Sequence, residues 1–249
     1  MNCCGSEHLV NQSFSLIISK LFEDFDYYLL VIGLILGFMG FGIGLRWSSS
    51  WIRRQSKDIY VKKAQSEGYR ARSAYKLLEI NEKFKILRPK MTVMECGGAP
   101  GSWTQVLTQK VHSGEVISCD LLDYDPVDHA IILPQSDFTL PQTQEIILGH
   151  LKADGFDLVL SDMAPNASGM SELSHQQILN LSYEVTKFAL RHSNKGAIFL
   201  TKLWDGEGTQ DFISDLKRFY RNVQIVKPKA SRKESAEIYI YASKFKGLA

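Results

Sequence analysis

Short β-rich runs alternate with stretches whose apolar residues recur at helical spacing from about residue 70 onward, and this alternation constrains the fold most strongly. Several runs are continuously apolar, as expected of strands buried on both faces of a parallel sheet. The predicted strands are 92–96, 115–120, 130–133, 157–161, 197–203, 223–227 and 237–241. The predicted helices are 73–84, 102–109, 143–151, 174–191 and 211–220, with Ser102 and Ser174 as N-caps. This order predicts a doubly wound α/β domain around a seven-stranded, mostly parallel sheet.

The length and composition allow one substantial core. The chain has 249 residues, of which 45% are hydrophobic and 22% charged, so neither a disordered nor a fibrous chain is indicated. Its four cysteines form no CxxC pair and have no metal-ligand spacing with the six histidines. They favour a reduced compartment and argue against a structural zinc site.

Positive charge is concentrated in the globular part of the chain. Residues 1–50 hold two basic and four acidic residues, which leaves 27 basic against 23 acidic residues, a net charge of +4, for residues 51–249. Basic residues cluster at 53–72 and again at 227–233. Either cluster fits a surface that meets phosphates, and a solvated face is the alternative.

The N-terminal segment differs in kind from the rest. Residues 27–45 are 19 residues without a charge, which is long enough to cross a bilayer as a helix. Four glycines in this segment form small-xxx-small pairs that suit helix packing in lipid. Arg46, Arg53 and Arg54 follow it and would place the rest of the chain on the cytoplasmic or matrix side. A membrane anchor, a targeting sequence and an extension from a wrong start site remain open, and we expect a division into 1–50 and 51–249.

A glycine-rich turn follows the first predicted strand. Glu95 lies near the end of that strand. Gly97, Gly98 and Gly101 let the backbone approach a ligand at the start of the next helix, and Pro100 stiffens the bend. The turn lacks the spacing of a dinucleotide-binding GxGxxG and the Lys-Ser or Lys-Thr of a phosphate-binding loop. A tight connection without a ligand is the simpler alternative.

Acidic residues follow the next two predicted strands. Asp120 lies about 20 residues beyond the turn, where an acid accepts hydrogen bonds from ribose hydroxyls. Asp137 follows the third strand and is suited to accept from an adenine amine. Either acid alone is more typical of a cap or a surface position. Together with the turn they favour an adenosine-type cofactor without a pyrophosphate.

Four charged residues lie at the edges of segments that are predicted to be buried: Lys76, Asp162, Lys202 and Glu237. Two of them, and the acids of the first two strands, fall at the carboxyl ends of predicted strands. A doubly wound sheet carries its ligand site at this edge. Two lysines and two acids beside a nucleotide-type pocket indicate group transfer.

The segments 95–103, 161–166, 202–208 and 231–239 resemble the FtsJ/RrmJ family of S-adenosylmethionine-dependent RNA ribose 2′-O-methyltransferases. The resemblance covers about residues 57–245 and includes the four members of the family's Lys-Asp-Lys-Glu tetrad in order. It implies a Rossmann-like methyltransferase fold for residues 51–249. The residues that it assigns to S-adenosylmethionine are Glu95, Gly97, Gly98, Pro100, Gly101, Trp103, Asp120, Asp137 and Asp162. Glu95 stands where an Asp is usual and Gly98 where an Ala is usual, and neither departure should abolish cofactor binding.

The reaction implied by the resemblance needs alignment of oxygen, methyl and sulfur and the loss of one proton, with no metal required. Lys202 is expected to contact the ribose 2′-hydroxyl, which it either deprotonates or orients. Asp162 is expected to position both Lys202 and the donor. Lys76 and Glu237 are expected to hold the target nucleotide and complete the charge network.

The resemblance also indicates the substrate. Residues 230–235 look like the mitochondrial branch of the family. This likeness implies a mitochondrial location and 2′-O-methylation of a uridine in large-subunit ribosomal RNA, either free or in a pre-ribosomal particle. Membrane association through residues 27–45 is left open. Residues 231–235 supply donors suited to phosphates, 167–172 are expected to form a loop near the substrate, and Trp204 is a candidate for base stacking. The alternatives are a transfer-RNA ribose methyltransferase and a membrane-associated ribosome-assembly or RNA-binding factor.

Overall fold

The computed structural model describes residues 58–165 and 171–248. Residues from Ile59 onward belong to one compact unit. The uncharged segment 27–45, the expected division at residue 50 and part of the first basic cluster lie outside the described residues, as do residues 166–170 of the expected substrate loop. In the part of the chain that the structure describes, no helix has the length and apolar character needed to cross a membrane.

Seven strands form one sheet in the order β3-β2-β1-β4-β5-β7-β6. They are β1 (Thr92–Cys96), β2 (Glu115–Cys119), β3 (Ile131–Leu133), β4 (Phe156–Ser161), β5 (Ser193–Trp204), β6 (Tyr220–Val226) and β7 (Glu237–Phe245). The first five strands pair in parallel, whereas β7 is antiparallel to both β5 and β6. The predicted mostly parallel α/β sheet is therefore confirmed.

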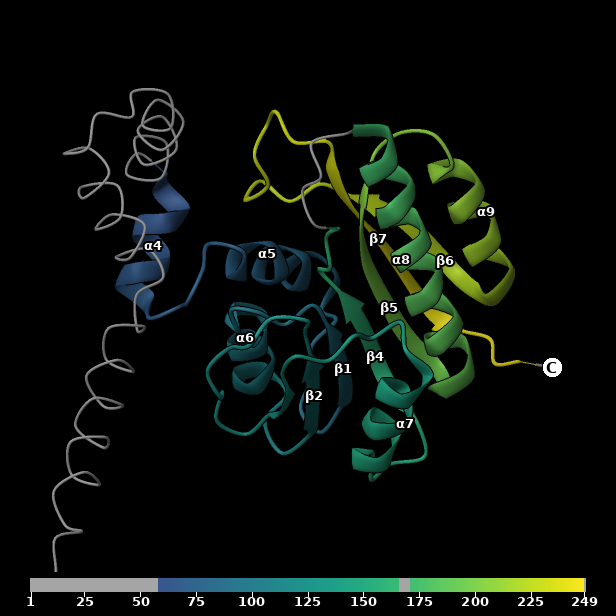
Figure 1. Cartoon of the computed structure of the whole chain (residues 1–249), viewed down its shortest axis with the longest axis horizontal. Coiled ribbons are helices and arrows are strands. Elements are labelled where there is room, and N and C mark those ends of the chain that lie inside the picture. Colours follow the sequence, from purple (N-terminus) through teal and green to yellow (C-terminus); the bar gives the residue numbers. More distant parts are fainter. Residues whose placement is uncertain (1–57, 166–170, 249) are drawn as a thin grey trace, which may run out of the picture. The chain divides into compact units, whose positions relative to one another are not determined.

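Helices cover both faces of this sheet (Figure 1). These covering helices are α5 (Ala74–Phe84), α6 (Ser102–Lys110), α7 (Pro141–His150), α8 (Ser171–His192) and α9 (Thr209–Phe219), and a further helix, α4 (Ile59–Glu67), precedes them. Buried side chains of α5 and α6 form one core with the sheet, and those of α7, α8 and α9 form the other. This two-sided cover is the doubly wound arrangement that the sequence predicts.

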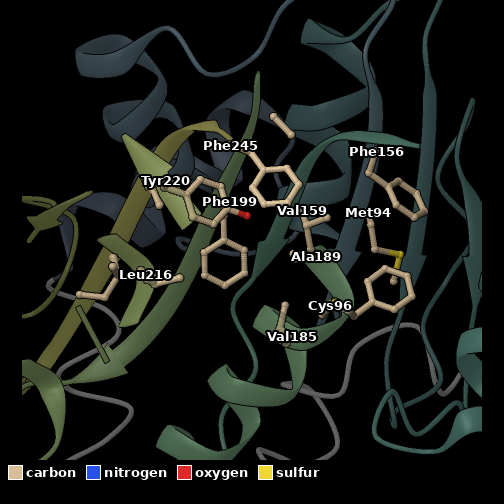
Figure 2. Packing of buried hydrophobic residues seen from close by; sticks show 14 of the residues in the cluster. Met94, Cys96, Phe156, Val159, Val185, Ala189, Phe199, Leu216, Tyr220 and Phe245 are labelled. Atoms are coloured by element: carbon tan, nitrogen blue, oxygen red, sulfur yellow. The ribbon is translucent and has the colours of Figure 1, made fainter. Parts of the chain in front are cut away.

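The alternation of side chains along the strands builds the two cores. In β1, Val93 packs in the core of α5 and α6, whereas Met94 packs in the core of α7, α8 and α9. Figure 2 shows Met94 near Phe156 in the latter core, where Phe156 and Phe188 lie with ring centroids 5.7 Å apart. Each such buried aromatic side chain stabilises the fold by about 1.5–3 kcal/mol. The rigid sheet that results fixes the residues at its carboxyl edge.

The register of the parallel strands brings their carboxyl ends to one level. Cys96 of β1 pairs with Cys119 of β2 and with Ser161 of β4, and Ser161 pairs with Thr201 of β5. The glycine-rich turn, Asp162 and the end of β5 therefore meet at one edge. Because β7 runs in the opposite direction, it brings its first residues to this same edge, and Lys202 pairs with Tyr239.

The predicted N-caps are wrong. Gly101, in the left-handed region at φ 101°, precedes α6, and Ser102 is the first helical residue. The Ser102 hydroxyl is instead 2.7 Å from the hydroxyl of Ser73, at the start of α5. Helix α8 begins at Ser171, so Ser174 lies inside it. For α6, the left-handed backbone of Gly101 decides the first helical residue.

Helix α4 is an element that the sequence analysis does not predict. Only Ala64 of α4 is fully buried, so its sequence carries a weak apolar pattern. Side chains of α4 contact α5. Tyr60 donates a hydrogen bond to Glu79 of α5 over 2.9 Å and packs on Tyr75 with ring centroids 5.5 Å apart. Tertiary contacts with α5 hold α4 in place.

Candidate active site

Lys202 and Asp162 form an ion pair at the carboxyl edge of the sheet. The distance from Lys202 Nζ to Asp162 Oδ1 is 3.0 Å, and Nζ also donates a hydrogen bond to the Asp162 main-chain carbonyl. Only 8% of the Lys202 side chain and 16% of the Asp162 side chain are exposed. The two contacts hold the ammonium group in one position at the edge of the core.

Tyr239 completes the surroundings of the Asp162 carboxylate. Its hydroxyl donates a hydrogen bond to Asp162 Oδ1 over 2.7 Å. Burial acts to raise the pKa of Asp162, but the charges of Lys202 and Lys76 and the hydrogen bonds from Tyr239 and Lys202 lower it overall. Burial, the charges of Asp162 and Glu237 and the hydrogen bond to Asp162 raise the pKa of Tyr239. Asp162 is therefore ionised at neutral pH and Tyr239 is a donor.

Lys76 and Glu237 form a second ion pair. Lys76 Nζ of α5 is 2.7 Å from Glu237 Oε2 at the start of β7, and their side chains are 15% and 13% exposed. Ser231 donates a hydrogen bond to the other carboxylate oxygen over 2.7 Å. Lys76 Nζ also lies 5.9 Å from the centre of the Tyr239 ring, so Tyr239 is in contact with both ion pairs. The structure thus brings the four predicted charged residues together in two pairs.

The sequence analysis gives no role to Tyr239. The signal that would have found it is the alternation of a strand, in which residues two apart point to the same face. Tyr239 is two residues beyond Glu237, which the sequence analysis selects.

The glycine-rich turn approaches the segment after β4 closely. Gly97 has φ 83°, and a Cβ there would lie 2.8 Å from both the backbone nitrogen and Cγ of Met163. The amide groups of Gly97 and Gly98 donate to the carbonyl of Cys119 over 2.9 and 3.2 Å. A Cβ at Gly98 would lie 2.1 Å from the hydroxyl of Ser118. The close approach of neighbouring residues therefore leaves no room for side chains at Gly97 and Gly98.

The two predicted acids lie at or next to this turn. Asp120 accepts hydrogen bonds from the amides of Ala99 and Leu122 over 2.9 and 2.8 Å, so it ties the turn to the end of β2. The carbonyl of Asp120 accepts from the amide of Ser136 over 2.8 Å, which brings the segment of Asp137 alongside. Asp137 Oδ1 accepts hydrogen bonds from the amide and the hydroxyl of Thr139 over 2.9 and 2.7 Å.

Trp103, another predicted cofactor residue, is 2% exposed and lies between α5 and the charged residues. Its indole N–H donates to the carbonyl of Ser73 over 2.8 Å, and its ring centroid is 5.7 Å from that of Tyr239. In this position Trp103 forms a wall of the site.

Glu95 is fully buried beneath the turn. Thr104 donates a hydrogen bond to Glu95 Oε2 over 2.6 Å, and Oε1 has no hydrogen-bond partner. Burial raises the pKa of Glu95 to about 7, despite the opposing effects of the hydroxyls of Thr104 and Ser118.

Glu95→Gln is expected to change the pH dependence of stability. The pKa of Glu95 in the folded protein is about 7, above its ordinary value of 4.5, so the cost of the buried charge sets in as the pH rises between these values and is constant above them. The stability of Glu95→Gln relative to wild type should therefore rise by up to about 3 kcal/mol between pH 5 and 8. Urea unfolding across this range measures the difference, with the exposed Glu234→Gln as control. A difference independent of pH would contradict the assignment.

The described residues also define what the site can hold. Among residues 58–165 and 171–248, no group of three or more His, Cys, Asp or Glu side chains is placed to bind a metal ion. The glycine-rich turn and the acids beside it are compatible with S-adenosylmethionine, which has hydroxyls, amines and a positive sulfur.

The fold and this edge of the sheet define a Rossmann-like methyltransferase. The chain belongs to the FtsJ-like methyltransferase family, whose sequence model matches residues 69–245. The resemblance stated from the sequence is confirmed, as is the expectation of a methyltransferase.

Known relatives align with most of the chain. The mitochondrial rRNA methyltransferase 2 of Drosophila melanogaster is 45% identical over 209 residues, which cover 80% of this chain and 84% of that protein. The ribosomal RNA large subunit methyltransferase E of Azoarcus sp. (strain BH72) is 43% identical over 194 residues, which cover 78% of this chain and 94% of that protein. A crystal structure of a Plasmodium falciparum protein assigned as a ribosomal RNA methyltransferase has a TM-score of 0.65 at 26% identity and covers 72% of this chain and all of that one.

Proposed function

We propose that the protein transfers a methyl group from S-adenosylmethionine to the ribose 2′-hydroxyl of a uridine in large-subunit ribosomal RNA. The observation that carries the proposal is the pair of buried ion pairs, Lys202–Asp162 and Lys76–Glu237, which Tyr239 joins beside the glycine-rich turn. The names of the fly and bacterial relatives support ribosomal RNA as the substrate.

The cofactor would supply an electrophilic methyl group on a sulfonium. We assign its binding to Glu95, Gly97, Gly98, Pro100, Gly101, Trp103, Asp120, Asp137 and Asp162. Asp120 would accept from the ribose hydroxyls, since its two oxygens already lie at the turn, and Asp137 from the adenine amine. The ionised Asp162 would favour the positive donor electrostatically.

Lys202 would orient the 2′-hydroxyl of the substrate. Its ammonium group is held by both the side chain and the carbonyl of Asp162, so it can direct a lone pair of the hydroxyl oxygen toward the methyl group. The methyl group would pass from sulfur to the hydroxyl oxygen, and the hydroxyl proton would pass to solvent water. Lys76 and Glu237 would hold the target nucleotide next to this centre, since their ion pair lies on the other side of Tyr239.

Mitochondrial ribosomal RNA is the proposed substrate within this class. The mitochondrial relatives from fly and worm are 45% and 42% identical to this chain. The exposed residues Lys229, Arg232 and Lys233, which precede β7, provide cations for RNA phosphates. We further propose that residues 1–50 form an extension to the domain of residues 51–249 and that the segment 27–45 acts in targeting or membrane association.

Labelled S-adenosylmethionine and the full-length chain test the proposal directly. We expect label in large-subunit ribosomal RNA or its precursor particle, recovered as 2′-O-methyluridine after nucleoside analysis. Label in transfer RNA instead would show that the protein belongs to the alternative substrate class. Cofactor binding without labelling of any RNA would favour an assembly or RNA-binding factor.

A further inference from the structure

Glu79 lies one helical turn beyond Lys76 on α5, and its carboxylate holds a turn of the chain far away in sequence. Glu79 Oε2 accepts hydrogen bonds from the amides of Lys229 and Ala230 over 2.6 and 3.2 Å. The other oxygen, Oε1, accepts from the hydroxyl of Tyr60 over 2.9 Å. Hydrogen bonds from backbone amides to a carboxylate oxygen are charge-assisted and are stronger than neutral ones.

The turn that Glu79 holds is fixed from several sides. The amide of Ser231 donates to the carbonyl of Pro228 over 3.0 Å, which closes the turn. The Arg72 guanidinium donates to the carbonyl of Ala230, and the Ala230 side chain is fully buried against α4 and α5. The backbone of residues 228–231 is therefore fastened to the same helix that carries Lys76.

The turn leads directly into the charged residues of the site. Ser231, its last residue, donates to Glu237 Oε1 over 2.7 Å, while Lys76 Nζ binds the other oxygen over 2.7 Å. Glu237 is thus held on one side by Lys76 itself and on the other by Ser231, whose position depends on Glu79. Both supports start from α5, so the helix sets the carboxylate relative to its own lysine.

We infer that Glu79 is a positioning residue for methyl transfer, because it fixes the 228–231 turn on α5 and so places Ser231 against Glu237. The inference rests on the proposed function, in which Glu237 and Lys76 hold the target nucleotide. Glu79 itself touches neither residue in the contacts described. Its loss would leave the amide of the buried Ala230 without its acceptor and release Ser231 from Glu237.

A double-mutant cycle tests this route from Glu79 through Ser231. We expect Glu79→Ala and Ser231→Ala each to lower kcat about 10-fold, and the double variant to lower it by about the same factor because both changes break one chain of contacts. Cofactor affinity should stay at the wild-type value. Glu79→Gln should recover part of the activity, since its amide oxygen can still accept from the turn. Tyr60→Phe removes the other hydrogen bond of the same carboxylate and should leave kcat unchanged.

Either of two kinetic results would overturn the inference. One is a wild-type kcat in Glu79→Ala. The other is additivity, with the double variant about 100-fold below wild type, which would mean that Glu79 acts independently of Ser231.

Amide hydrogen exchange separates this inference from the proposed function, because it needs no substrate. Exchange at Lys229 and Ala230 should be at least about 10-fold faster in Glu79→Ala than in wild type or Tyr60→Phe. Unchanged exchange overturns the inference even where the wild type methylates ribosomal RNA. Faster exchange in the variant, with a wild type that methylates no RNA, overturns the proposed function instead.

Discussion

Replacing Lys202 by alanine is expected to lower kcat for methyl transfer at least about 1,000-fold, the effect of losing a group that acts on the reacting atoms. The Lys202 ammonium is held by the side chain and the carbonyl of Asp162, and alanine leaves nothing in that place to orient the 2′-hydroxyl. The affinity for S-adenosylmethionine should change less than about threefold, because the glycine-rich turn, Asp120 and Asp137 are untouched and Asp162 keeps the hydrogen bond from Tyr239.

Single-turnover transfer to ribosomal RNA and calorimetric titration of the cofactor measure the two quantities separately. Lys195→Ala is the matched control, since Lys195 lies on the same strand but is exposed, and it should behave as wild type. Turnover of Lys202→Ala near the wild-type rate would contradict the proposal that Lys202 orients the 2′-hydroxyl. Loss of cofactor binding along with turnover would place Lys202 in the cofactor site instead.

Gly97→Ala is expected to weaken the binding of S-adenosylmethionine at least about 100-fold. The backbone of Gly97 has φ 83°, and the added Cβ would meet the backbone nitrogen and Cγ of Met163 at 2.8 Å. The Met163 backbone cannot move aside easily, because the preceding residue, Asp162, donates its amide to the carbonyl of Cys96 over 3.1 Å. The turn must therefore shift, and the cofactor surface shifts with it.

Gly149→Ala is the control for a glycine-to-alanine change. Gly149 lies near the end of α7, and a Cβ there has no neighbour within 4 Å, so cofactor affinity should stay unchanged and stability rise by about 0.5–1 kcal/mol. Calorimetric titration and thermal unfolding of both variants give the comparison. Wild-type cofactor affinity in Gly97→Ala would show that the turn does not form the binding surface.

Most strands of the fold could be predicted because buried strands appear in the sequence as apolar runs. The strand Thr92–Cys96 is buried at each position and agrees with the predicted bounds. Strand β5 begins at Ser193, earlier than predicted. The prediction missed this start because the first residues of the strand are not buried and form no apolar run. Helix α4 depends on the side-chain contacts of Tyr60 with α5, which leave no periodic signal in the sequence. Elements fixed by tertiary contacts are those that sequence patterns miss.

The candidate site divides in the same way. Lys76, Asp162, Lys202 and Glu237 stood out as charges beside apolar segments, and the structure places them in two ion pairs. The sequence does not predict the residues that position these two ion pairs. No pattern near Glu79 indicates that its carboxylate binds amides 150 and 151 positions away. These hydrogen bonds form because α5 packs against the turn before β7, and only the folded chain defines this contact.

The ion pair between Lys76 and Glu237 joins residues 161 positions apart, and Glu237 opens the last strand of the sheet. During synthesis the glycine-rich turn, Asp162 and Lys202 all leave the ribosome before β7 does. Until then the chain lacks Glu237 and Tyr239, and with them the partner of Lys76, the hydroxyl that donates to Asp162 and the ring beside Trp103. On the proposed mechanism, methyl transfer therefore requires that β7 has inserted between β5 and β6.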